Sequence, residues 1–275
     1  MDANTQRRIQ RYGWDKAADA YEAGWRDSLA LVQARLLDVA AARPGEQALD
    51  VACGTGLVTF PLAEATTSSG RVVATDISQS MIDIMRRETQ RRCLSQVDAF
   101  RADAEALGSV PDNTFDLVTC ALGFMYFPDP GRAMKEIERF LKPGGRVVIA
   151  VWGARANCGW SEIFPIVDAR VRSAVCPMFF RLGTGRTLAG EMEHAGLNSV
   201  VDERLATALP YSDGDAASDA AFIGGPVALA YSRFSDEIRS EARAEYLASI
   251  RDFRSNEGYR IPGEFVVASG RKAYA

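Results

Sequence analysis

Three aspartates and two glycines stand where apolar, strand-like runs of the chain end. Asp50 lies in the apolar run that precedes Gly54 and Gly56. Asp76 follows 20 residues after the second glycine, and Asp103 closes a third run. Glycine lets a ligand approach the backbone, and amides at the start of a helix favour an anionic group. Carboxylates at such strand ends accept hydrogen bonds, so the pattern predicts a site for a ligand with hydroxyl and amine groups.

Two cofactor classes use an acid at the position of Asp76 to bind ribose hydroxyls, namely nicotinamide dinucleotides and S-adenosylmethionine. The dinucleotide pattern needs glycine or alanine where this chain has Thr59. Asp50 would repel a pyrophosphate, whereas it suits the ammonium of a bound methionine. Asp103 can accept a hydrogen bond from the exocyclic amine of adenine. S-adenosylmethionine explains all three features, because it carries an amine, a ribose and an adenine but no phosphate.

The elements that must position these residues alternate between strands and helices. Apolar runs predict strands at 47–52, 70–78, 97–105, 115–122 and 142–152, and helical spacing predicts helices at 14–40, 56–66, 79–94 and 131–141. This alternation is typical of a parallel, doubly wound sheet. After Trp152 the rhythm breaks into stretches rich in aromatic residues, with a helix expected at 187–196 and a strand at 198–206. A long amphipathic helix that includes Ile238 and Phe253 follows.

Four segments of the chain carry a family pattern: LDVACGTGLVT, VVATDIS, ADAEAL and FDLVTCALGFMYFPDPGRAMKEIERFLKPGGRVVI. Together they resemble class I S-adenosylmethionine-dependent methyltransferases, and they are most similar to the UbiE-like small-molecule branch. The resemblance covers residues 45–153 well and 12–21 more loosely. It implies an α/β fold with a Rossmann-like, seven-stranded, mostly parallel sheet, whose last strand is antiparallel, with helices on both faces and capping insertions.

The resemblance also implies how one domain, 1–275, is divided. The expected parts are N-terminal capping helices at 1–42, a cofactor-binding core at 45–152, lid insertions at 153–186 and 207–260, and closing sheet elements at 187–206 and 264–272.

The family pattern assigns a role to each strand end. It implies that Asp50 receives the methionyl ammonium, that Asp76 holds the ribose and that Asp103 meets the adenine edge. The implied cofactor-binding residues are Asp50, Ala52, Cys53, Gly54, Gly56, Asp76, Ile77, Met81, Asp103, Ala104, Cys120 and Leu122.

The acceptor pocket is expected among aromatic residues. Methyl transfer from a sulfonium is an in-line displacement with a neutral leaving group, so the enzyme mainly aligns the reactants and excludes water. His194, the single histidine, is expected near a helix end that points away from the cofactor, so no catalytic base is assigned, and no metal site is predicted. Aromatic faces can bind a cation or simply form an apolar lid. The candidates are Trp14, Tyr21, Phe124, Tyr126, Trp152, Trp160, Phe179, Phe180 and Tyr211.

Composition limits the partners and the compartment. A net charge of −4 disfavours a nucleic-acid partner. No apolar run approaches the roughly 20 residues of a membrane span, and the N-terminal residues lack the apolar segment of a signal peptide. The five cysteines are odd in number and never spaced CxxC, which favours a reducing cytoplasm. A homodimer is compatible with this composition.

The sequence therefore predicts S-adenosylmethionine-dependent methyl transfer to a small, partly apolar metabolite by proximity and desolvation. Two alternatives stay open, an NAD(P)-dependent oxidoreductase on a Rossmann sheet and a non-catalytic regulatory protein that binds S-adenosylmethionine. The sequence names neither the acceptor atom nor the substrate.

Overall fold

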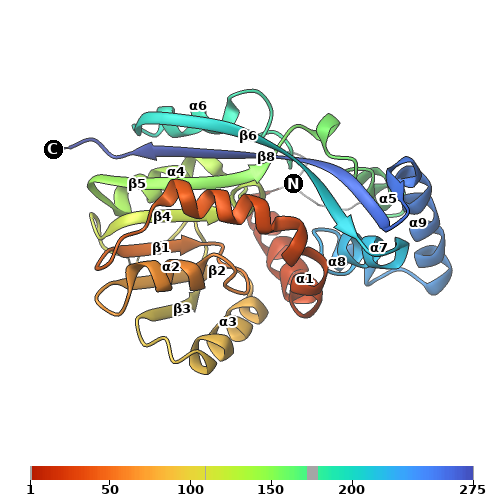
Figure 1. Ribbon diagram of the computed structural model, residues 1–275, viewed down its shortest axis with the longest axis horizontal. Coiled ribbons are helices and arrows are strands. Elements are labelled where there is room, and N and C mark those ends of the chain that lie inside the picture. Colours follow the sequence, from red (N-terminus) through yellow and green to blue (C-terminus); the bar gives the residue numbers. More distant parts are fainter. Residues whose placement is uncertain (1, 109, 172–178, 275) are drawn as a thin grey trace.

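The computed structural model describes residues 2–108, 110–171 and 179–274, and its helices surround one large sheet (Figure 1). The helices are α1 (Ala3–Ala40), α2 (Thr59–Thr66), α3 (Gln79–Arg91), α4 (Pro130–Phe140), α5 (Ile163–Asp168), α6 (Thr187–His194), α7 (Gly214–Phe222), α8 (Ala228–Tyr231) and α9 (Asp236–Ser249), with short 3₁₀ turns η1 (Phe124–Tyr126), η2 (Arg155–Asn157) and η3 (Arg251–Phe253). The strands are β1 (Gln47–Val51), β2 (Arg71–Asp76), β3 (Val97–Arg101), β4 (Phe115–Ala121), β5 (Leu141–Trp152), β6 (Asn198–Tyr211), β7 (Arg254–Ser255) and β8 (Gly258–Arg271).

The strand order of the sheet places a ligand site at the ends of β1 and β4. Neighbouring strands follow the order β3-β2-β1-β4-β5-β8-β6, and the two-residue β7 pairs with β8. Strands β1 to β5 are parallel, whereas β8 runs antiparallel to both β5 and β6. The predicted parallel, doubly wound sheet with an antiparallel last strand is confirmed. The strand order reverses at β1, and open α/β sheets bind ligands outside the carboxyl ends of strands at such a point.

Helices cover both faces of the sheet, which explains why the central strands are mostly apolar. Figure 1 shows α1, α2 and α3 on the near face and α4 on the far face, where α4 contacts α6. The last six residues of β5 are all buried, as expected for a strand covered on both sides. The core therefore fixes the strand ends that carry the predicted ligand-binding residues.

The N-terminal cap is a single helix of 38 residues, α1, where the sequence analysis expected several helices within 1–42. Its regular spacing was visible only from Trp14 onward, but the helix begins at Ala3 because Asp2 caps it and accepts a hydrogen bond from the Thr5 amide at 3.0 Å. Asp15 holds this helix against the start of α3. Its carboxylate accepts from the Ser78 hydroxyl at 2.7 Å and from the Ser80 amide at 3.1 Å.

The second insertion is shorter than the predicted 207–260, because both flanking strands continue past the expected closing elements. β6 and β8 remain paired as far as Tyr211 opposite Tyr259. Figure 1 shows these two strands running beyond the parallel strands to α7 and α9. Antiparallel pairing with a neighbour stabilises these added residues, whose sequences (TALPY and GYRIPG) contain proline and glycine and carry no clear strand signal.

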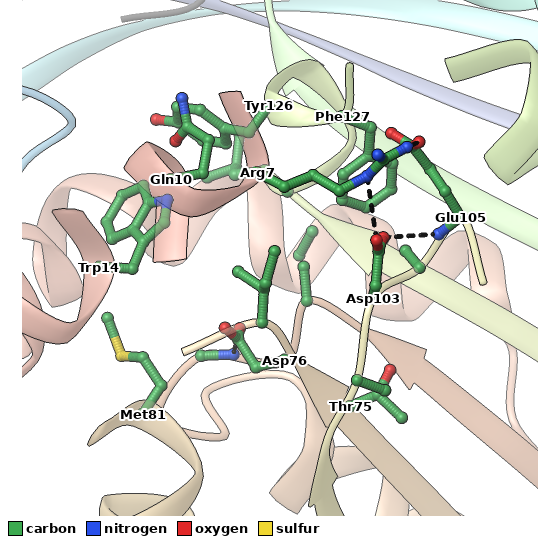
Figure 2. A pocket seen from close by; sticks show the side chains of 18 of the residues that line it. Arg7, Gln10, Trp14, Thr75, Asp76, Met81, Asp103, Glu105, Tyr126 and Phe127 are labelled. Atoms are coloured by element: carbon green, nitrogen blue, oxygen red, sulfur yellow. Dashed lines mark hydrogen bonds and ion pairs between the residues drawn. The ribbon is translucent and has the colours of Figure 1, made fainter. Parts of the chain in front are cut away.

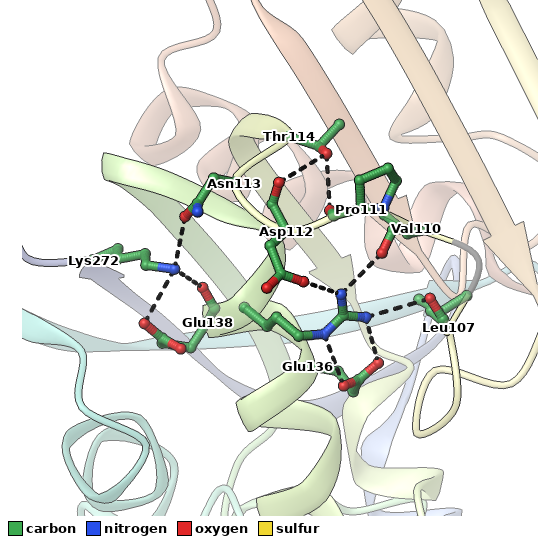
Figure 3. Close-up of polar contacts among 10 residues, drawn as sticks. Leu107, Val110, Pro111, Asp112, Asn113, Thr114, Glu136, Glu138 and Lys272 are labelled. Carbon is green, nitrogen blue, oxygen red and sulfur yellow. Dashed lines mark hydrogen bonds and ion pairs between the residues drawn. The ribbon is translucent and has the colours of Figure 1, made fainter.

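The loop between β3 and β4, which carries Asp103, is held by a side chain of α4. The Arg139 guanidinium donates to the Val110 carbonyl at 2.9 Å and also binds the Asp112 carboxylate (Figure 3). Glu136, one turn earlier, accepts from the same guanidinium at 2.9 Å. These contacts anchor the far end of a loop that has no helix of its own.

Candidate functional site

A cavity with about 750 Å³ of empty space lies at the carboxyl ends of β1, β2, β3 and β4, under the first half of α1. Figure 2 shows Asp76 and Met81 on one side and Asp103 on the other, with Arg7, Gln10 and Trp14 of α1 above them. We call this space the cofactor cavity. Eight of the predicted cofactor residues line it: Ala52, Gly54, Asp76, Ile77, Met81, Asp103, Ala104 and Leu122.

Asp76 joins the glycine loop to the start of α3. Its carboxylate accepts hydrogen bonds from the Gly54 amide at 2.9 Å and from the Ser78 amide at 2.8 Å. Burial raises the pKa of Asp76 to about 6, against the lowering effect of these two amides. Each oxygen keeps a free lone pair beside the cavity, so the group can accept from two further donors such as a ribose diol.

Backbone conformation brings the loop after β1 close to the cavity. Gly54 has a φ of 56°, and a Cβ built on it would meet no atom within 4 Å, so a side chain there would occupy ligand space. Ala52 and Leu122, which also line the cavity, have positive φ values of 56° and 61° although they carry side chains. Such strain is common at binding sites, where the surrounding structure holds it in place.

Asp50 lies beneath the glycine loop, outside the lining of the cofactor cavity. It accepts from the Thr59 hydroxyl at 2.6 Å and from the Thr119 hydroxyl at 2.8 Å. Burial raises the pKa of its carboxyl to about 6. Asp50 borders a smaller cavity of about 300 Å³, the loop cavity, together with Cys53 and Thr55. The Thr55 hydroxyl is buried and has no hydrogen-bond partner among the described residues, so it can donate to a ligand there.

Asp103 is part of an ion-pair cluster that the sequence analysis missed. Arg7, from the first turns of α1, lies 3.0 Å from the Asp103 carboxylate through Nε and also pairs with the buried Glu105 (Figure 2). Glu105 accepts in addition from the Asp129 amide at 2.9 Å. Arg7 carries no sequence signal, because its acidic partners lie about 100 positions later. The cluster closes the cofactor cavity at its Asp103 end.

A third cavity, with about 310 Å³ of empty space, is walled by aromatic rings, and we call it the aromatic chamber. Trp152 and Trp160 lie 4.7 Å apart between ring centroids. The chamber shares four lining residues with the cofactor cavity, and Tyr21 also borders the loop cavity. The shared residues are Trp14, Tyr21, Leu122 and Tyr126. The three spaces therefore meet around Tyr21.

Several predicted site residues line none of these three cavities. Gly56 has a φ of 100°, and a Cβ there would clash with Phe60 and Met85, so packing explains this glycine. Cys120 is fully buried. The aromatic residues Phe124, Phe179 and Tyr211 are buried as well, and Phe179 contacts the ring of Tyr126, a chamber residue, at 5.3 Å. Phe180 is likewise outside the lining.

The phenol and the thiols near the junction keep their protons at pH 7, whereas the carboxyls of Asp50 and Asp76, with pKa values of about 6, are mostly ionised. Burial raises the pKa of the Tyr21 phenol and of the Cys53 and Cys120 thiols above their usual values. His194 lies on α6, exposed, with its ring nitrogen 2.6 Å from the Gly190 carbonyl. Among residues 2–108, 110–171 and 179–274, no three acids, cysteines or histidines are grouped as a metal site.

Comparison with known families identifies the family to which the chain belongs. Residues 27–165 match the model of the ubiE/COQ5 methyltransferase family, which is half of the chain. The chain belongs to the ubiE/COQ5 methyltransferase family. The resemblance inferred from the four sequence segments is confirmed. The cofactor of the family is S-adenosylmethionine, and the free Gly54 surface and the unpartnered Thr55 hydroxyl fit its amino-acid end.

Relatives of this ubiE/COQ5 family member support the same fold. A demethylmenaquinone methyltransferase of Bacillus cereus is 40% identical over 114 residues, which are 42% of this chain and 46% of the relative. The chain thus matches about half the length of such relatives. The YcgJ protein of Bacillus subtilis covers 91% of this chain, and 100% of its own, with a TM-score of 0.61 at 18% identity. Phosphoethanolamine N-methyltransferase 2 of Haemonchus contortus, in complex with S-adenosylhomocysteine, covers 94% of this chain and 58% of its own with a TM-score of 0.60 at 16% identity.

Proposed function

We propose that this ubiE/COQ5 family member transfers a methyl group from S-adenosylmethionine to a small, partly apolar metabolite. The observation that carries the proposal is the junction of the cofactor cavity and the aromatic chamber at Tyr21 and Leu122. A ligand in each space would bring its end to this junction. Such proximity is the main requirement for an in-line methyl transfer.

The cofactor would lie across the carboxyl ends of the first three strands. Asp103 and Ala104 would hold the adenine, and Asp76 would accept from the ribose hydroxyls. The methionyl end would extend into the loop cavity, where Thr55 can donate to its carboxylate. Asp50 borders the same loop cavity, and each of its oxygens accepts only one threonine hydroxyl, so a lone pair on each remains to receive the methionyl ammonium.

The chain contributes alignment and the exclusion of water. When bound, S-adenosylmethionine supplies a methyl group on a sulfonium, whose departure needs no acid. The chamber residues that the structure describes are aromatic or aliphatic and include no aspartate, glutamate, lysine, arginine or histidine, so they do not ionise an acceptor at pH 7. An acceptor must therefore arrive with an available electron pair. Once the apolar lining has excluded water, electrostatic contacts at the junction become stronger.

The acceptor is proposed at the level of a class. The matched family segment, 27–165, begins after Trp14 and Tyr21, and it ends before Pro226, which also lines the chamber. Four of the ten described lining residues, Trp14, Tyr21, Trp25 and Pro226, therefore lie outside the segment that matches the family model. The name of the Bacillus cereus relative makes a quinol one reasonable member of the test panel.

A transfer assay with radiolabelled S-adenosylmethionine tests the proposal. Phenols, quinols, amines and thiols are offered separately, and label is counted in the extracted product. We expect label in at least one acceptor class, with the Asp76→Asn variant reduced and the exposed Asp83→Asn variant unchanged. Binding of S-adenosylhomocysteine without any product would favour the regulatory alternative, and binding of NAD(P) instead would favour the oxidoreductase.

The proposal includes the expected partner and compartment. Among the described residues, no helix is long and apolar enough to span a membrane. Four described cysteines are unpaired, which suits the reducing cytoplasm expected from the sequence. Light scattering of the purified chain would decide between a monomer and a homodimer.

A further inference from the structure

One buried hydrogen-bond donor in the aromatic chamber has no acceptor. Trp160 is 2% exposed, and its indole Nε1 has no hydrogen-bond partner among the described residues. Trp25 provides the contrast in the same chamber, because its indole N–H donates to the Ala220 carbonyl at 3.0 Å. A buried donor without a partner is costly, so each instance in a folded protein calls for an explanation.

The described residues around Trp160 place aromatic rings against it. Its ring lies 5.8 Å from that of Trp25, 4.7 Å from that of Trp152 and 5.7 Å from that of Phe179. These neighbours pack against it and exclude water. Trp160 itself lines the aromatic chamber, and its indole N–H has no acceptor among the described residues, so the chamber is where an acceptor on a ligand would lie.

The chamber is complementary to a ligand that accepts hydrogen bonds. Tyr21 is partly buried and lines both the chamber and the cofactor cavity, and its phenol keeps its proton, so it is a second possible hydrogen-bond donor there. Among the described residues that line the chamber, none carries a charge that could balance an ammonium. The face of Trp152 is also occupied, since its ring lies 4.3 Å from that of Phe265. These features favour a neutral or anionic oxygen over a cationic nitrogen.

We propose that Trp160 is a specificity-determining residue, whose indole N–H donates to a carbonyl or hydroxyl oxygen on an apolar, ring-shaped acceptor. The inference rests on the proposed function, because it assumes that the aromatic chamber is the acceptor site. It goes further by naming the group that distinguishes a substrate from an apolar molecule of the same shape. Trp160 acts in binding and orientation, and the electron pair for methyl transfer comes from the acceptor.

The test compares two probes that differ only in this group. Titrations of 1-naphthol and 1-methylnaphthalene are carried out in saturating S-adenosylhomocysteine, so that the cofactor cavity is occupied while binding to the aromatic chamber is measured. The measured quantity is the ratio of the two dissociation constants. Loss of packing alone would weaken both probes and leave the ratio unchanged.

Two matched variants, Trp160→Phe and Trp25→Phe, remove one indole N–H each. We expect Trp160→Phe to lower the preference for 1-naphthol by about three- to tenfold relative to wild type, the range expected for one hydrogen bond. In Trp25→Phe the preference should stay within about twofold, because that N–H already has a protein acceptor. Equal changes in both variants, or no change in Trp160→Phe, would overturn the proposal.

A measurement on the wild-type protein keeps the proposal testable if Trp160→Phe does not fold. The chain has four tryptophans, so the indole N–H resonance of Trp160 can be assigned by elimination with Phe variants of Trp14, Trp25 and Trp152. We expect 1-naphthol to move this resonance downfield, while 1-methylnaphthalene does not. Identical shifts, or no binding of either probe, would overturn the proposal. Failure of S-adenosylhomocysteine to bind would instead refute the proposed function.

Discussion

Replacing Asp76 by asparagine should weaken cofactor binding strongly while leaving the fold intact. The two carboxylate oxygens accept from different amides, that of Gly54 at 2.9 Å and that of Ser78 at 2.8 Å. Asparagine has one oxygen, so its NH₂ group must face either one of these N–H donors or the ribose. The variant also loses the charge that strengthens the bonds from the ribose hydroxyls.

The expected loss follows from the value of a charge-assisted hydrogen bond. Such a bond contributes about 1.5–3 kcal/mol, so a loss of about 2 kcal/mol corresponds to roughly 30-fold in affinity. Calorimetric titration with S-adenosylhomocysteine measures it, and thermal unfolding checks that the variant is folded. The control is Asp83→Asn, the same change at an exposed position of α3. An Asp76→Asn affinity within about twofold of wild type would refute the assigned role, since one such bond is worth more.

The pH dependence of binding gives a second measure of the same group. Burial raises the pKa of Asp76 to about 6, so its carboxyl gains a proton as the pH falls below that value. Ribose hydroxyls donate best to the ionised form, so affinity should fall toward acid pH by up to about tenfold per pH unit. Asp50 titrates in the same range. The part due to Asp76 is therefore the pH dependence that Asp76→Asn removes.

Three further predictions concern the elements around the cavities. Arg7→Met removes the cation that pairs with the buried Glu105, and urea denaturation should show a loss of about 1–3 kcal/mol in unfolding free energy; no loss would argue against the ion pair. Asp50 has a pKa raised by burial from 3.8 to about 6, so its ionisation opposes folding as pH rises. The unfolding free energy of Asp50→Asn relative to that of wild type should therefore rise by about 2 kcal/mol between pH 4.5 and pH 7. A difference that does not change with pH would contradict this. Asp15→Ala removes the acceptor for Ser78 and should speed hydrogen exchange in the first half of α1, which mass spectrometry measures against an unchanged rate in α9.

The parallel core could be predicted from the sequence because its signals are local. Each strand is an apolar run that ends at a polar or glycine residue, and Asp50, Asp76 and Asp103 mark three of these ends. Strand ends in a parallel sheet lie at one edge, so position along the chain predicts position in space. For this reason eight of the predicted cofactor residues line one cavity.

The rest of the site depends on contacts between distant parts of the chain. Arg7 meets Asp103 and Glu105 only after α1 has folded over the sheet, and its own neighbours in sequence are polar residues of no distinct pattern. Gly56 belongs to the family motif, yet its side-chain space is taken by Phe60. Aromatic composition indicated the chamber but could not separate Trp160, which lines it, from residues that only pack behind it.

A calorimetric titration of the purified chain with S-adenosylhomocysteine, beside a parallel titration with NAD⁺, tests the central claim most directly. The placement of Asp76 and Asp103 at the cofactor cavity, with Asp50 at the adjoining loop cavity, predicts saturable, one-to-one binding of S-adenosylhomocysteine and no heat of binding with NAD⁺. Binding of the dinucleotide alone, or of neither ligand, would contradict the account.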